Sequence, residues 1–246
     1  MTRPVALFVT CLVDQLYPRV GEATVSLLEE AGCSVEFPAD QTCCGQPCFN
    51  LGHRDEARSL VRRMVELFEP YETVVSPSGS CVSMLRCSGP GLFADEPQMQ
   101  ERARVVAGRT FELSEYLAGR GFRPSAVFRG RVAYHSSCHL LRELGVAGAP
   151  RDLLSQVEGL ELVELDDEAR CCGFGGAFSV ELPELSSAMA ADKLAAIERS
   201  GADVVTASDV GCLMQLGGAL TRRGARTRAV HLAELLAGVA APLGRG

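Results

Sequence analysis

Cysteine spacing constrains this chain more than any other feature of its sequence. Adjacent cysteines followed by glycine occur twice, at Cys43-Cys44-Gly45 and at Cys171-Cys172-Gly173. A further cysteine lies 32 residues before and another 37 after the first pair, and 33 before and 40 after the second. Eight of the eleven cysteines fall in this frame, in two sets: Cys11, Cys43, Cys44 and Cys81, then Cys138, Cys171, Cys172 and Cys212. The repetition predicts two four-thiol sites, each suited to a metal or a redox-active group.

Composition narrows the class of protein. The 246 residues are 47% hydrophobic, enough to bury a substantial core, and the net charge of −7 argues against nucleic acid or an anionic membrane surface as a partner. No run of 18 apolar residues predicts a membrane span, and the N-terminus shows no signal-peptide pattern. We therefore expect a cytoplasmic protein, where clustered cysteines indicate metal or redox chemistry more than disulfides. The basic residues are almost all arginine, which we attribute to base composition, with Lys193 the only lysine.

Short apolar runs alternate with amphipathic segments along the chain. Strands are expected at 5–9, 34–37, 73–75, 131–135, 160–165 and 203–206, and helices at 20–31, 53–68, 97–107, 150–157 and 182–200. The pattern restarts after a junction at 119–130, which indicates an internal duplication. We predict an α/β fold of two Rossmann-like, parallel-sheet halves with helices on both faces, one repeat at 1–122 and the other at 123–246.

The outer cysteines of each set follow predicted strands. Cys11 and Cys81 come after the first and third strands, and Cys138 and Cys212 take the same places in the second half. Ligands of open parallel sheets bind at the carboxyl ends of the strands, so the four thiols of each half should converge on one edge of its sheet. Cys81 and Cys212 are also expected to open helices, whose positive ends favour thiolates.

The spacing of the cysteines within each set indicates whether the set binds zinc or an iron–sulfur cluster. Structural zinc sites usually take two ligands from one short C-x₂₋₄-C loop. Here the close ligands are adjacent, and adjacent thiols reach two irons of a polynuclear cluster more readily than a single small ion. The spacing favours an iron–sulfur cluster over zinc, while a non-enzymatic, zinc-stabilised interaction module stays open as an alternative.

The repeated frame resembles the cysteine-rich CCG domain of heterodisulfide reductases and of related iron–sulfur subunits of dehydrogenases. Four stretches resemble one branch of that family, lactate utilization protein A: residues 8–11 (FVTC), 43–47 (CCGQP), 76–81 (SPSGSC) and 171–176 (CCGFGG). The resemblance implies an iron–sulfur oxidoreductase subunit in the oxidation of L-lactate to pyruvate, with a ferredoxin-like iron–sulfur subunit and a third subunit as partners. It also implies one or two iron–sulfur clusters, of the 4Fe–4S type, held by the eight cysteines. A thiol–disulfide redox subunit like heterodisulfide reductase is the alternative.

The chain departs from the fuller CCG pattern at one point in each repeat. That pattern ends in C-x-x-C, whereas Met84 and Gln215 stand at the final positions here. The fifth ligand of a noncubane cluster is therefore missing in both halves, and four thiolates still satisfy an ordinary 4Fe–4S cluster.

Three cysteines lie outside the frame. Cys33 should be a small apolar core residue at the start of a buried strand, and Cys87 a structural residue. Cys48, four residues after Cys44, is a possible further ligand.

Two histidines flank Cys138, and His135 is our candidate for a catalytic residue or a contact with the cluster. The alternative is a polar loop in which His135 and His139 hydrogen-bond the sulfurs. Of the other histidines, His53 should start a helix and His231 should be buried after a strand.

Overall fold

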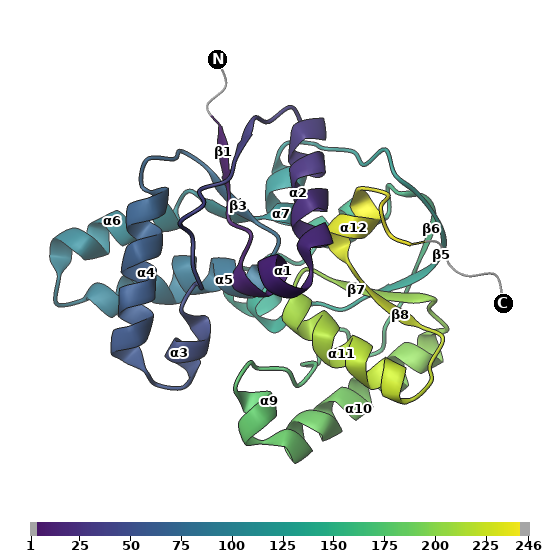
Figure 1. The fold of residues 1–246 in the computed structure, drawn as a ribbon. Helices are drawn as coiled ribbons and strands as arrows, with labels where there is room; N and C mark the ends of the chain where they lie inside the picture. Colours follow the sequence, from purple (N-terminus) through teal and green to yellow (C-terminus); the bar gives the residue numbers. More distant parts are fainter. Residues whose placement is uncertain (1–3, 242–246) are drawn as a thin grey trace.

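The computed structural model describes residues 4–241, so the first three residues, part of the segment without a signal-peptide pattern, lie outside the described residues (Figure 1). Eight strands form two sheets, all of them parallel. The first half contributes β1 (Val5–Leu7), β2 (Val35–Glu36), β3 (Val74–Ser76) and β4 (Thr110–Glu112). The second contributes β5 (Val127–Tyr134), β6 (Glu158–Val163), β7 (Val204–Ala207) and β8 (Arg228–His231).

Helices alternate with these strands. The first half holds α1 (Cys11–Leu16), α2 (Pro18–Glu30), α3 (Gln46–Asn50), α4 (Arg54–Phe68), α5 (Gly79–Ser83), the π-helical η1 (Met84–Ser88), the 3₁₀ η2 (Gly89–Phe93), α6 (Pro97–Ala107) and α7 (Leu113–Gly119). The second holds the π-helical η3 (His139–Glu143), α8 (Ala149–Leu154), α9 (Phe178–Glu181), α10 (Pro183–Ser200), α11 (Val210–Arg222) and α12 (Leu232–Leu236). The predicted fold class, two Rossmann-like parallel-sheet halves, is confirmed.

Strand order explains where a ligand site can form. The sheets run β2-β1-β3-β4 and β6-β5-β7-β8, so each half has the same topology. In both, the chain moves outward in one direction from the first strand and then returns to the other side of it. The crevice of such a sheet opens at this reversal, between β1 and β3 and between β5 and β7.

Three apolar clusters hold the layers together. One lies between the two sheets and includes Leu27 of α2, Leu117 of α7, Leu154 of α8 and Leu235 of α12, so residues of both halves share a core. The other two lie on the far faces of the sheets, under α4 and α6 in one half and under α10 and α11 in the other. Helices therefore cover both faces of each sheet, as Figure 1 shows.

Several details differ from the sequence-based expectations. β5 begins at Val127, inside the stretch expected to be a junction. β2 is a two-residue edge strand, and Val35 and Glu36 are partly or largely exposed, so the expectation of a buried strand there is wrong. The helix α1, which starts at Cys11, was not predicted because six residues are too few to show helical periodicity. Within residues 4–241, no helix combines the length and apolar character needed to cross a bilayer.

Candidate metal centre

The first set of cysteines converges at the crevice between β1 and β3. Cys11 is the first residue of α1, four residues past the end of β1, and Cys81 lies in α5, just past β3. The loop between β2 and α3 carries Cys43 and Cys44. Thiol contacts join Cys43 to Cys11 and to Cys44, and Cys44 to Cys81. Four thiols that are up to 70 positions apart in sequence thus form one contact chain.

The second set repeats this arrangement. Cys138 follows β5, Cys212 lies in the first turn of α11 after β7, and the loop before α9 carries Cys171 and Cys172. Cys171 contacts Cys138 and Cys172, and Cys172 contacts Cys212. All eight thiols are free, so both sets are available as ligands. The convergence that the strand pattern predicted is what the structure shows.

Both sets open into a single cavity of about 350 Å³, lined by all eight cysteines. Ser78, Ser80, Ser137, Asp209 and His139 line it as well, together with Phe174 and the backbone of Gly175 and Gly176. The sequence predicted one site at the edge of each sheet but could not predict that the two sites face each other.

Glycine is required after each cysteine pair. Gly45 and Gly173 have φ angles of +89° and +84°, a conformation that residues with a side chain rarely adopt. A Cβ atom on Gly173 would lie 2.5 Å from the backbone oxygen of Ser186, and one on Gly45 would lie 3.2 Å from that of Ala57. These close approaches hold the cysteine loops against α10 and α4.

Within each set, the thiols differ in how readily they ionise. The pKa of Cys43 is lowered because the thiols of Cys11 and Cys44 hydrogen-bond to it, and that of Cys171 is lowered by Cys138 and Cys172 in the same way. The Gly173 N–H also donates to the Cys171 sulfur, at 3.4 Å. The donor thiols are correspondingly harder to ionise, since two neighbouring thiolates repel each other. A bound cation would remove this repulsion, so the donor chemistry of both sets fits a metal group.

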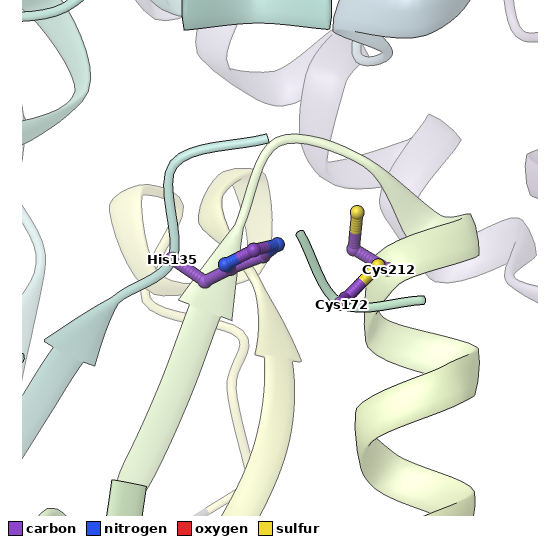
Figure 2. Close-up of side chains that lie close together, drawn as sticks. All are labelled: His135, Cys172 and Cys212. Carbon is purple, nitrogen blue, oxygen red and sulfur yellow. The ribbon is translucent and has the colours of Figure 1, made fainter. Parts of the chain in front are cut away.

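His135 lies behind the second set rather than on the cavity wall. Its side chain is fully buried at the end of β5, and neither ring nitrogen has a hydrogen-bond partner. Ligand atoms of His135, Cys172 and Cys212 all lie within 4.8 Å of one another. In Figure 2 one ring nitrogen is on the side facing the two cysteines. Burial lowers the pKa of His135 to about 3, and the Lys193 ammonium adds to that effect.

Asp209 joins the two halves beside the cavity. It precedes α11, yet its Oδ1 accepts hydrogen bonds from the first half: from Ser78 Oγ at 2.9 Å, Ser80 N–H at 3.0 Å and Ser80 Oγ at 2.7 Å. Its Oδ2 accepts one from Ser137 Oγ in its own half. Sequence reasoning assigned no role to Asp209, because an aspartate in this position is ordinarily read as the cap of its own helix.

Lys193 is the second residue whose role sequence reasoning missed. Its side chain is fully buried, and Nζ donates to the backbone oxygens of Asp167 at 2.8 Å and Glu168 at 2.9 Å. These carbonyls belong to the segment that leads into Cys171. A lysine on the buried side of α10, next to Leu194 and Ile197, was the available indication. Its status as the only lysine is therefore more than a matter of base composition.

The other cysteines lie away from the cavity. Cys33 packs against the core shared by both halves, with its sulfur 3.5 Å from the Tyr116 hydroxyl, as expected of a small core residue. Cys48 is partly buried in α3 without lining the cavity, and Cys87 is exposed.

The positions of the missing fifth ligands also lie outside the cavity wall. Met84 is buried in the apolar cluster under α4 and α6. Gln215 donates through Nε2 to Ser186 Oγ at 2.8 Å, and Ser186 in turn donates to the Gly173 carbonyl at 2.8 Å. Both residues support the structure around their cysteine sets.

The remaining histidines divide between the site and the structure. His139 lines the cavity, and His53 precedes α4 as expected. His231 is buried at the end of β8, as predicted, and its Nε2 lies 3.1 Å from the Pro77 backbone oxygen of the other half.

Fold and site together define a class: a duplicated α/β protein whose two cysteine sets line one cavity between its halves. A model of the cysteine-rich domain called CCG matches residues 5–86 and 132–217, the two segments that hold these sets. The chain belongs to this family and, within it, to the proteins named lactate utilization protein A.

Two relatives illustrate the match. The chain is 47% identical to lactate utilization protein A of Halalkalibacterium halodurans over 94% of this chain and 96% of the relative. It is 44% identical to the protein of the same name from Bacillus subtilis, over 94% of this chain and 98% of that one.

Among solved structures, a hypothetical protein from Helicobacter pylori is similar in fold alone, with a TM-score of 0.67 and 10% sequence identity. The match covers 98% of this chain and 50% of that one, so the chain spans half the length of that structure.

Proposed function

We propose that this protein is an iron–sulfur oxidoreductase subunit that acts in the oxidation of L-lactate to pyruvate. One observation carries the proposal: eight free thiols, in two matching sets of four, line a single cavity. Four thiolates are the protein ligands of a 4Fe–4S cluster. Two such sets in one cavity suit two clusters placed close enough to exchange electrons.

The choice of lactate comes from the relatives. Proteins 44–47% identical over 94% of this chain carry the name lactate utilization protein A. That name indicates a set of proteins acting together, and we include a ferredoxin-like iron–sulfur subunit and a third subunit as partners of this chain. They would deliver electrons to, or take them from, the clusters held here.

The chain's own residues have defined parts in this function. The first set (Cys11, Cys43, Cys44 and Cys81) and the second (Cys138, Cys171, Cys172 and Cys212) would each hold a cluster, which accepts and passes on single electrons when bound. Gly45 and Gly173 let the cysteine loops turn against their helices. Asp209 fixes the Ser78–Ser80 loop, and with it Cys81, against the second half.

Anaerobic purification followed by iron and sulfide analysis tests the metal group. The expected protein is coloured, bleaches with dithionite and gives an EPR signal when reduced. Cys171→Ser should lose the iron of the second set and keep that of the first. Cys33→Ser, a thiol away from the cavity, is the matched control and should keep all of it. A colourless protein with stoichiometric zinc would contradict the proposal and support the zinc-stabilised interaction module.

The substrate is tested separately, with the partner subunits present. Lactate should reduce the clusters of the assembled complex, and Cys171→Ser should abolish this reduction. The rival thiol–disulfide reductase predicts the opposite: no response to lactate, and oxidation of the reduced clusters by a disulfide.

A further inference from the structure

The two thiol sets share one frame but have different surroundings. The residue three positions before the first cysteine is Phe8 in one half and His135 in the other. Both side chains are fully buried at the ends of corresponding strands, next to the crevice. Phe8 packs among the apolar residues under α4, against the ring of Phe68 at 5.5 Å between centroids. An apolar ring therefore packs well at this position in the first half, whereas the second half has the polar ring of His135 there.

A buried imidazole without partners needs an explanation. The His135 backbone N–H donates to the Thr206 carbonyl at 2.8 Å, as the strand pairing requires. The ring has a weak contact with the Glu168 backbone, but neither ring nitrogen has a partner at normal hydrogen-bond geometry. Buried polar atoms are nearly always paired, because removing them from water without a partner is costly. Packing alone would favour phenylalanine, as in the first half. The unpaired nitrogens thus indicate a partner that binds in the site.

The thiols of Cys172 and Cys212 lie within 4.8 Å of a ring nitrogen and of each other (Figure 2). Donor atoms bound to one ion, at about 2.0–2.3 Å from it, lie no more than about 4.5 Å apart. Small side-chain adjustments bring the three atoms to that separation. Imidazole and thiolate together suit iron and zinc, and histidine replaces cysteine in some iron–sulfur centres.

We propose that a ring nitrogen of His135 is a ligand of the metal group held by the second cysteine set. The two centres of the chain then differ in chemistry: the first is bound by thiolates alone, and the second by thiolates and one imidazole. Where the imidazole takes the place of one of the four thiolates on an iron, the centre is less negative, which raises its reduction potential.

This inference rests on the proposed function, since it assigns a ligand to one of the proposed clusters. Its first test uses the wild-type chain, labelled with ¹⁵N-histidine and reduced anaerobically. Pulsed EPR should show a ¹⁵N hyperfine coupling to one of the two centres. His135→Phe should remove the coupling, and His139→Gln, at the other histidine near the set, should keep it. An iron-loaded wild type without the coupling, or a coupling that persists in His135→Phe, overturns the proposal.

A second test needs no iron. The metal-free, reduced chain is titrated with Co²⁺, whose d–d absorption reports its ligands. His135→Phe should weaken Co²⁺ binding at the second set by about 10–100-fold and shift its absorption. His53→Gln, at an exposed histidine outside the cavity, should leave that binding unchanged.

The two tests separate the two proposals. If the purified chain holds no iron, the proposed function fails, while Co²⁺ still reports whether His135 is a ligand. If Co²⁺ affinity and absorption are the same in wild type and His135→Phe, the ligand proposal fails, whatever iron the chain holds. Circular dichroism shows whether His135→Phe folds, and the ¹⁵N measurement on the wild type does not depend on any variant.

Discussion

Glu112 gives a quantitative test of the packing between the two sheets. It ends β4 and precedes α7, with only 1% of its surface exposed. Its Oε2 accepts hydrogen bonds from Ser114 N–H at 2.8 Å, Glu115 N–H at 3.3 Å and the Ser114 hydroxyl. Its Oε1 has no partner. Burial raises the pKa of Glu112 to about 7, the hydrogen bonds from Ser114 and Glu115 oppose that change, and the carboxylate of Asp209 adds to it.

The sign and size of the effect on stability follow from this pKa. In the unfolded chain Glu112 ionises near 4.5, and in the folded protein near 7. Below pH 4.5 the group is protonated in both states and costs nothing. Between pH 4.5 and 7 the unfolded state gains stability by ionising while the folded state does not. At 1.36 kcal/mol for each pH unit, the folded protein loses about 3 kcal/mol across this window, and no more above it.

Glu112→Gln removes the titration and keeps a carbonyl oxygen to accept the bonds to α7. Urea unfolding of the metal-free, reduced protein is measured from pH 4.5 to 8 for wild type and variant. The free energy of unfolding of the variant, relative to wild type, should rise by about 3 kcal/mol between pH 4.5 and 7.5. The exposed Glu158→Gln is the control and should give a flat difference. If the difference in free energy of unfolding between Glu112→Gln and wild type were also independent of pH, burial would not raise the pKa of Glu112 as argued.

Two further predictions concern the cysteine loops and the contact between the halves. Gly173→Ala places a Cβ 2.5 Å from a backbone oxygen, on a residue whose φ is +84°. We expect this variant to hold less iron per chain, and its free energy of unfolding to fall by about 2 kcal/mol or more. In Gly45→Ala the new Cβ lies 3.2 Å from the nearest backbone oxygen, so this variant should lose less iron and less stability. Equal losses in the two variants would contradict the reasoning. Asp209→Ala leaves the hydroxyls of Ser78 and Ser80 and the Ser80 N–H without their acceptor, and urea unfolding should show a loss of about 3 kcal/mol or more. Asp209→Asn keeps one acceptor oxygen and should lose less free energy of unfolding. A urea midpoint for Asp209→Ala equal to that of the wild type would refute the role assigned to Asp209.

Strand and helix positions were largely predictable because apolar periodicity is a local property. The runs at 5–9 and 203–206 fall on β1 and β7, and the helix expected at 182–200 is α10 within one residue. β4 was not predicted as a strand, and β8 was predicted only as the strand before His231, without bounds. They have three and four residues, too few for alternation to show, and the helices α7 and α12 begin at the next residue. Their place at the sheet edge is set by tertiary packing rather than by local sequence.

The cysteine sets were predictable for a different reason. Once Cys11 and Cys81 are placed after parallel strands, the topology of an open sheet brings them to the same edge, whatever their separation in sequence. The shared cavity was not predictable in this way. It depends on how the halves pack, which is decided by apolar contacts such as that of α2 with α12 and by Asp209 crossing to Ser80. No spacing in the sequence encodes these contacts.

The divergence of the repeats bears on what the second site is for. A duplication that served only to build a symmetric core would tolerate the same apolar residues in both halves. Instead the second half has buried polar groups beside its cysteines: His135 in the place of Phe8, and Lys193, whose ammonium is close enough to Cys172 to interact with it electrostatically. The carboxylate of Asp209 hydrogen-bonds both to the Ser78–Ser80 loop that leads to Cys81 and to Ser137 beside Cys138, so it does not distinguish the two sets. In a site shielded from water, a nearby positive charge favours the reduced state of a centre and a negative charge disfavours it. Under the proposed function, clusters held by two such sets in unequal surroundings would differ in potential, and that difference would give electron flow between them a direction.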